Sequence, residues 1–348
     1  EPMNSSSFED NGDDDVDDDD EFFGGVVNGG VGRPLSKSMK KKKKRLKSYY
    51  YGGRTTGGGM WCLPFGARLR QASILARREA HDKLVDPEKW TATLTLKIFV
   101  GIIIGIVWIG QGDGKTQKDI FPVQGALFIV SVNSMMDVTF QTALALTSSR
   151  NLLLRELRNN HYTLFPRHVA VLAVDCVLAA LSTLALGVPV AFLVGLRTDV
   201  VHFLRFVAIA VILAGQGVCF GHCVGTAADD FQQVQAIVSP CLTPLILFSG
   251  YMIPKKSIPY ALKWVYDVSF FQYAVTNFNI NEFRGKQFKD CSLQGEELGL
   301  CYSSGGHFLR ANAFNPANFV RNYVILLAFW AFLATLSFIA YTRVIARH

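Results

Sequence analysis

The chain has 348 residues, of which 50% are hydrophobic and 18% are charged, and its formal net charge at pH 7 is +7. This composition is too apolar for an ordinary soluble protein, and the apolar residues are gathered in long runs. Seven cysteines, an odd number, exclude complete pairing within the chain.

Residues 1–59 are low in complexity, with an acidic block at 13–21 and a basic block at 37–47. Because blocks of like charge repel and bury no core, we expect a disordered, charged linker here. The basic run at 40–45 allows three interpretations: a solvated linker, a contact with anionic membrane lipids, or a nuclear or nucleic-acid signal. The apolar runs that follow favour lipid over nucleic acid, so we expect no nucleic-acid partner.

Residues 60–90 predict a basic amphipathic helix that lies along a membrane surface. Its apolar residues recur at helical spacing, and arginines and lysines occupy the remaining face. The apolar set is Phe65, Leu69, Ala72, Leu75 and Ala76. Pro87 is typical of the first turn of the next helix.

Six apolar segments follow, each long enough to cross a membrane, because about 20 helical residues span a hydrocarbon core of about 30 Å. They are Thr91–Ile109, Phe121–Leu146, Phe165–Gly195, Val201–Ala228, Val234–Ile253 and Phe319–Thr342. A span of this length tolerates one charge, such as Lys97, Asp137 or Asp175. The sequence therefore predicts an all-α polytopic membrane protein, with residues 91–348 as its membrane domain.

The second span is polar along one side, where Asn133, Asp137 and Thr139 lie. Buried polar groups in lipid need partners or a water-filled cavity, so this side either forms hydrogen bonds between helices or lines a cavity. The charged stretch 148–161 then leads into the third span. It is either a basic amphipathic helix that moves with that span or an ordinary cytoplasmic loop.

Two further patterns predict no chemistry of their own. Gly114-Lys115-Thr116 lacks the first glycine of a phosphate-binding loop and follows a membrane helix instead of a strand. His222 has no second histidine or carboxylate at the spacing of metal ligands. We therefore expect neither a nucleotide site nor a metal site.

Lysine and arginine are concentrated at 68–89, 150–167 and 343–348. The positive-inside rule places these segments, and both termini, in the cytoplasm. The aromatic segment 258–280 is broken by polar residues and predicts a re-entrant helix before the last span. Cys291 and Cys301 follow in a polar, outward-facing loop, where we expect a disulfide within the loop or between two protomers.

These features together resemble the membrane half of the G (white) subfamily of ABC transporters, the ABC-2-type transmembrane domain, over residues 65–348. The most specific piece is Phe248-Ser249-Gly250-Tyr251-Met252-Ile253, followed by Ile258-Pro259, Trp264 and Asn281-Glu282-Phe283-Arg284-Gly285. This order is similar to the family's fifth span, re-entrant helix and Asn-Glu-Phe-x-Gly motif. The stretch from Arg150 through Arg155-Glu156 is similar to its charged motif before the third span.

The resemblance implies a dimeric half-transporter that exports a lipophilic molecule, such as a sterol, lipid or pigment. It implies that 60–90 is a connecting helix and that Arg150, Arg155 and Glu156 belong to a coupling helix. It implies a substrate cavity at the dimer axis and an apolar gate above it. The cavity residues are Asn133, Met136, Thr139, Leu242, Thr243 and Ile246, and the gate residues are Tyr251 and Met252.

No Walker A motif, signature motif or catalytic glutamate after a strand is present, so we expect no ATPase site in this chain. The resemblance places ATP and Mg²⁺ in a separate nucleotide-binding domain, with residues 1–59 as the end of a linker to it. The implied partners are that domain, a second identical or different half-transporter, and membrane lipids. The alternative is a structural or regulatory membrane protein that pumps nothing.

Overall fold

The computed structural model describes residues 65–85, 87–113, 116–158, 162–289, 291 and 301–347. The predicted linker at 1–59 lies outside these residues, as do Gly114 and Lys115. The described part of the chain is helical and contains no β-strand, with one isolated bridge between Gln287 and Ser304. This confirms the predicted all-α class.

Five long apolar helices in the described residues have the length and composition of membrane spans. They are α3 (Pro87–Val107), α4 (Ile120–Arg158), α5 (Leu164–Val194), α6 (Val200–Ala227) and α12 (Phe319–Arg347). A shorter apolar helix, α7 (Phe231–Leu247), corresponds to the predicted fifth span. The amphipathic helix α2 (Phe65–Leu84) precedes them, as expected.

The fifth span is shorter than the predicted Val234–Ile253. α7 ends at Leu247 after 17 residues, and Gly250 then adopts a φ of 86° that a helix does not allow. At about 1.5 Å per residue the helix is about 25 Å long, near the lower limit for crossing a bilayer. Five of the six predicted spans therefore have the length of a membrane span, and α7 occupies the place of the fifth as a shorter apolar helix.

The second span is longer than the predicted Phe121–Leu146, and the charged stretch that we expected to lead into the third span continues the second one instead. Residues 148–158 continue α4 without a break, because they contain neither glycine nor proline. The charged motif is therefore the last part of the second membrane helix. Tyr162 and Thr163 lie between it and α5.

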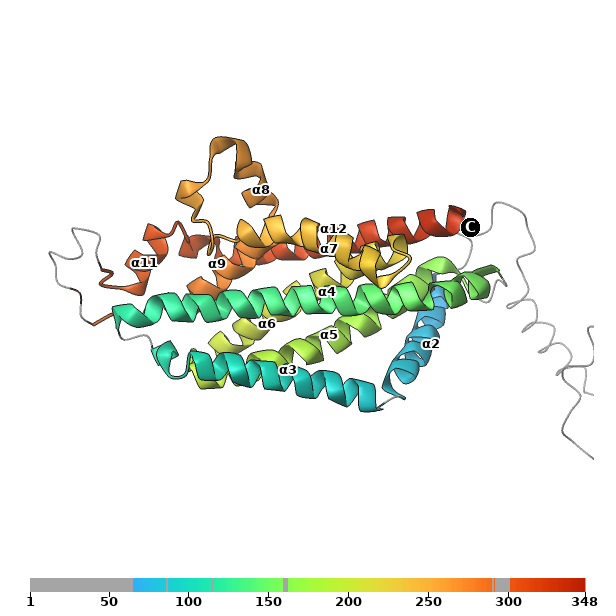
Figure 1. Ribbon diagram of the computed structural model, residues 1–348, viewed down its shortest axis with the longest axis horizontal. Coiled ribbons are helices and arrows are strands. Elements are labelled where there is room, and N and C mark those ends of the chain that lie inside the picture. The colour runs from blue at the N-terminus through green and yellow to red at the C-terminus, as the bar shows by residue number, and fades with distance from the viewer. Residues whose placement is uncertain are drawn as a thin grey trace, which may run out of the picture. The chain divides into compact units, whose positions relative to one another are not determined.

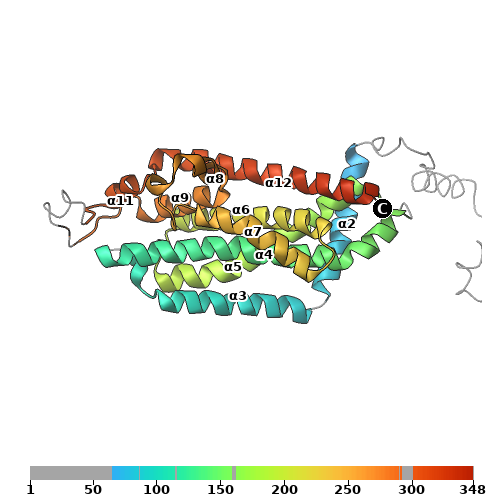
Figure 2. The same ribbon diagram turned by 45° about the horizontal axis from the view of Figure 1, so that its top comes forward.

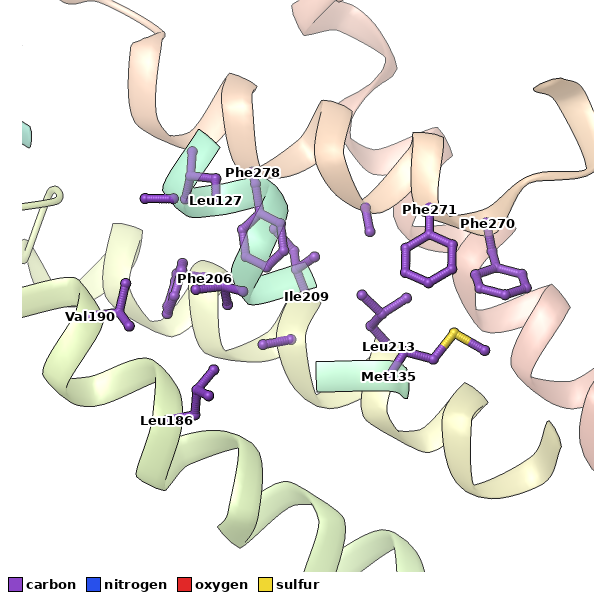
Figure 3. Packing of buried hydrophobic residues seen from close by; sticks show 14 of the residues in the cluster. Leu127, Met135, Leu186, Val190, Phe206, Ile209, Leu213, Phe270, Phe271 and Phe278 are labelled. Atoms are coloured by element: carbon purple, nitrogen blue, oxygen red, sulfur yellow. The ribbon is translucent and has the colours of Figure 1, made fainter. Parts of the chain in front are cut away.

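The core forms around α6, which contacts α4, α5, α9 (Phe270–Phe283) and α12. Figure 3 shows Phe206, Ile209 and Leu213 of α6 between the side chains of α5 and those of α9. Gly217, Gly221 and Gly225 bring α6 close to the backbone of α4.

The predicted re-entrant segment forms two helices, α8 (Lys263–Val268) and α9, after the short turns η3 (Lys255–Ser257) and η4 (Tyr260–Leu262). α9 is buried along its length, with Tyr273 half-buried. The remaining elements are η1 (Gln111–Asp113), η2 (Gln117–Asp119), α11 (Gly305–Ala311) and η5 (Pro316–Asn318).

Within residues 63–348, the long helices run side by side and α2 crosses them at one end (Figures 1 and 2). The C-terminal end of α12 lies at the same end as α2, and α11 lies at the opposite end. The segments predicted to face the cytoplasm therefore share one end of the bundle.

Candidate functional site

The charged motif at the end of α4 contacts the amphipathic helix α2. Arg78 of α2 donates two hydrogen bonds to the Glu156 carboxylate, at 3.0 and 3.2 Å. The Tyr162 hydroxyl donates a third, at 2.6 Å, to the same carboxylate. Glu156 therefore joins α2, α4 and the start of α5 at one point.

A second set of ion pairs continues along α2 into the bundle. Glu79 accepts a hydrogen bond from Arg167 of α5 at 2.6 Å and lies 3.3 Å from the Lys83 ammonium. Lys83 also pairs with Asp175 of α5, and Asp175 lies 2.9 Å from Nε2 of His222 on α6. We call Arg78, Glu79, Lys83, Glu156, Tyr162, Arg167 and Asp175 the α2 junction.

Electrostatics keep Glu156 ionised at this junction. Burial opposes ionisation, but the hydrogen bonds from Tyr162 and Arg78 outweigh it and lower the pKa of the carboxyl below its ordinary value. Burial, with the hydrogen bond to Glu156, raises the pKa of Tyr162, so its hydroxyl stays a donor at neutral pH. The guanidinium groups of Arg78 and Arg167 lie 5.9 and 5.8 Å from the Tyr162 ring centre.

The three predicted coupling residues have different surroundings. Arg150 pairs with Asp229 and donates to the Ala228 carbonyl at 3.4 Å, so it ties α4 to the end of α6. Arg155 is exposed at the surface, whereas Glu156 holds the α2 junction. Of the three, Arg155 is therefore the one open to an incoming partner.

The predicted cavity residues lie on two neighbouring helices, α4 and α7. Asn133, Met136 and Ile246 are half-buried, and Thr243 is exposed, so these four reach the outer face. Leu242 is fully buried in the core.

Thr139 is fully buried too, and donates to the Met135 carbonyl at 2.9 Å and to the Gly217 carbonyl of α6 at 3.2 Å. Thr139 and Leu242 thus face inward within the single chain, and their place on a cavity wall stays a prediction. Both side chains pack against the rest of the bundle, Thr139 from α4 and Leu242 from α7.

The predicted gate residues also differ from each other. The Tyr251 ring stacks on Phe121 and Phe128 of α4, with ring centres 5.7 and 4.7 Å away. Met252 leaves 55% of its surface exposed. Tyr251 is therefore held on the end of α4 that lies away from α2, and Met252 is free to contact another molecule.

The motif Asn281–Gly285 contacts two loops and the first turn of α6 at the end opposite α2. Asn281 donates to the His202 carbonyl of α6 at 2.9 Å, and Glu282 accepts the Arg197 N–H at 3.1 Å. Lys286, which pairs with Glu282, donates to the Gly112 carbonyl at 2.7 Å. The motif thus fixes the loops that follow α3 and α5 against the end of α9.

Cys291 and Cys301 are joined by a disulfide within the chain, with Cα atoms 5.6 Å apart. Among the described residues, no three histidine, cysteine or carboxylate side chains cluster where a metal ion would bind.

The arrangement agrees with the family that the sequence matches. The family described as "ABC-2 type transporter" matches residues 70–283, and "CDR ABC transporter" matches residues 279–347. The chain belongs to the ABC-2 type transporter family. It is an integral, multi-pass membrane component of a transporter.

Similar proteins include the "Protein white" of Drosophila melanogaster, which is 28% identical over 65% of this chain and 32% of its own length. The "ABC transporter G family member 8" of Arabidopsis thaliana is 25% identical over 80% of this chain and 47% of its own length. The "ABC multidrug transporter I" of Aspergillus fumigatus is 28% identical over 66% of this chain and 17% of its own length. The chain therefore matches less than half of the length of each of these relatives.

Sequence reasoning missed most of the α2 junction. Glu79 and Lys83 are spaced four residues apart on α2, which predicts a pair within the helix but not the partners on α5. Asp175 and His222 are polar residues in two separate apolar spans. Because buried polar groups in a membrane need partners, the available signal was that these two side chains could pair with each other. His222 serves as a packing residue with a carboxylate partner.

Proposed function

We propose that this chain is the membrane half of an ATP-driven exporter of lipophilic molecules. Membership in the ABC-2 family supports transport, and the α2 junction is the observation that supports coupling to ATP hydrolysis. ATP and Mg²⁺ would be bound by a nucleotide-binding domain, because the sequence contains no complete phosphate-binding loop and the described residues contain no cluster of carboxylates that could bind a metal ion.

Force from that domain would enter at the α2 end of the bundle. Arg155 is exposed there beside Glu156, and Glu156 is bonded to α2 and to Tyr162. Because α4 runs unbroken from Ile120 to Arg158, a shift at Glu156 also displaces Asn133 and Met136. The coupling residues and the proposed cavity wall thus belong to one helix.

A second half-transporter would pack against the outer face of α4 and α7. This face carries apolar and weakly polar residues, which suits a lipophilic cargo between two such faces. In the single chain the face is open at Thr243 and partly open at Asn133, Met136 and Ile246. Met252 is exposed at the gate position.

The orientation proposed from charge places the α2 end in the cytoplasm. The test is labelling of intact cells with a membrane-impermeant thiol reagent, using single cysteines at exposed positions in a cysteine-free background. Ser257→Cys is expected to react from outside, and Arg155→Cys only after the membrane is opened. Reaction of Arg155→Cys in intact cells would reverse the orientation.

Coupling is tested in the complete transporter with the variant Glu156→Ala. We expect normal insertion and a large loss of substrate-stimulated ATPase activity, because the link between α2 and α4 is removed. The matched control is Glu88→Ala, an exposed carboxylate in the first turn of α3. Equal activity of the two variants would contradict the coupling role.

The second candidate is a regulatory membrane partner without transport of its own. Reconstitution with a nucleotide-binding domain separates the two proposals. Substrate movement that depends on ATP supports the exporter, and binding without movement supports the regulator.

A further inference from the structure

A pocket of about 340 Å³ lies where the first turns of α6 and α12 meet the end of α9. Its wall combines basic and apolar side chains and contains no carboxylate. The basic residues are His202, Arg205 and Arg284, and the apolar ones include Ile280, Phe319 and Val320. A wall of this kind suits an anionic group attached to an apolar body.

The two arginines have no counter-ion among the residues that the structure describes. Arg205 is exposed and its guanidinium lies over the Phe319 ring, 5.3 Å from the ring centre. Arg284 is exposed at the turn after α9. The first turn of α12 adds the positive end of a helix dipole to the same pocket.

Neighbouring carboxylates are engaged elsewhere. Glu282 accepts the Arg197 N–H and pairs with Lys286, so its charge is already balanced. Asp199 lies outside the pocket wall, largely in solvent, 3.5 Å from Nδ1 of His202. The pocket therefore keeps an excess of positive charge that an anion would neutralise.

The pocket lies at the edge of the apolar surface. The spans α6 and α12 both begin beside it, and Leu204, Val320 and Val324 leave 60%, 70% and 58% of their surfaces exposed. Exposed apolar side chains on membrane helices face acyl chains, whereas arginines near the helix ends reach the headgroup level. An anion in this pocket would thus be at the depth of lipid headgroups.

We propose that this pocket binds the phosphate group of a membrane phospholipid. Two guanidinium groups offer paired N–H donors that match phosphate oxygens, and Leu204 and Val324 would lie along the acyl chains. A volume of about 340 Å³ holds a headgroup but not the chains, which remain in the bilayer. The site is separate from the α4 and α7 face proposed for transport.

Native mass spectrometry of the full chain in detergent tests this proposal. Three probes are compared at equal concentration: dioleoylphosphatidylglycerol, dioleoylglycerol without phosphate, and glycerol 3-phosphate without chains. We expect retention of the first alone, reduced by about tenfold or more in Arg205→Gln and in Arg284→Gln. Arg321→Gln, an exposed arginine in the first turn of α12 outside the pocket wall, is the control and should retain the lipid.

Ala317→Trp provides a variant that keeps both charges and fills the pocket, because Ala317 is exposed on its wall. This variant should also lose the lipid while its unfolding temperature stays unchanged. Lipid retention in Ala317→Trp, or equal loss in Arg321→Gln, would overturn the proposal. Equal binding of dioleoylglycerol would show an apolar surface only, and displacement by glycerol 3-phosphate would show a site for soluble phosphate.

Discussion

Lys97 of α3 and Asp137 of α4 form an ion pair within the spans. Lys97 is buried, whereas 39% of the Asp137 side chain is exposed. Gln141 donates a further hydrogen bond to Asp137 at 2.9 Å. α3 packs mainly on α5 and has little contact with α4. The ion pair is therefore a direct connection between α3 and α4.

Removing one partner of this pair should destabilise the protein more than removing both. Lys97→Met leaves the Asp137 charge unpaired in a region of low dielectric constant, at a cost of about 1–3 kcal/mol of unfolding free energy, reduced by the exposure of Asp137. Lys97→Met with Asp137→Asn should recover part of the loss. Thermal unfolding of the wild type, the two single variants and the double variant measures the energy of interaction between Lys97 and Asp137. Strictly additive effects of the two substitutions would contradict the ion pair.

Stability at the α2 junction should depend on pH through Glu156. Its pKa in the folded protein lies below the ordinary value of 4.5, so its contribution is complete above that value and is lost as pH falls through the folded-state pKa. The unfolding temperature of the wild type should therefore drop more steeply below about pH 4.5 than that of Glu156→Gln, which does not titrate. Parallel curves for the two proteins would exclude this contribution.

Close packing of α4 and α6 should make Gly221 intolerant of any side chain. A Cβ atom at this position would lie 1.9 Å from the Thr142 hydroxyl and 2.7 Å from the Thr139 carbonyl oxygen, which is backbone and cannot rotate away. Gly221→Ala should cost about 1–3 kcal/mol of stability. Gly66→Ala on α2 is the control, because a Cβ there meets no atom within 4 Å. Similar unfolding temperatures for both variants would show that the helices are farther apart.

Loss of the Cys291–Cys301 disulfide should lower the stability of the protein but change its structure only in the loop that the disulfide closes. The two cysteines are ten residues apart, and closing a loop of this size restricts the unfolded chain by about 3 kcal/mol. Cys291→Ser with Cys301→Ser should lower the unfolding temperature without changing the packing around α6. Peptide mapping without reductant checks the pairing, and a peptide linked across two protomers would assign the bond to the dimer instead.

The sequence predicts the spans well, because their limits depend on local chemistry. α5 was predicted at Phe165–Gly195 and is observed at Leu164–Val194, with Gly195 ending the helix at a φ of 79°. The limits of α4 and α7 were less predictable. An apolar run does not reveal that a helix continues into charged residues, or that Gly250 takes a positive φ three residues after Leu247.

The candidate site was predicted less completely than the spans. Periodicity identifies a polar side of α4 but does not say whether another helix covers it. Thr139 therefore looked like a cavity residue, although α6 covers it and Gly217 accepts its hydrogen bond. Arg78 and Glu156 are 78 residues apart, so their pairing depends on how α2 folds back over α4 and α5, which no local pattern encodes.

The unbroken course of α4 has a mechanical consequence. At 39 residues the helix is a rod of about 58 Å, longer than the hydrocarbon core is thick. If the rod pivots near its closest approach to α6, a tilt of about 5° at Glu156 swings the opposite end, where Tyr251 stacks on Phe121 and Phe128, by a few ångströms. A small displacement of one end of α4 on one side of the membrane would in this way move its other end by a similar distance, in the opposite direction, on the other side.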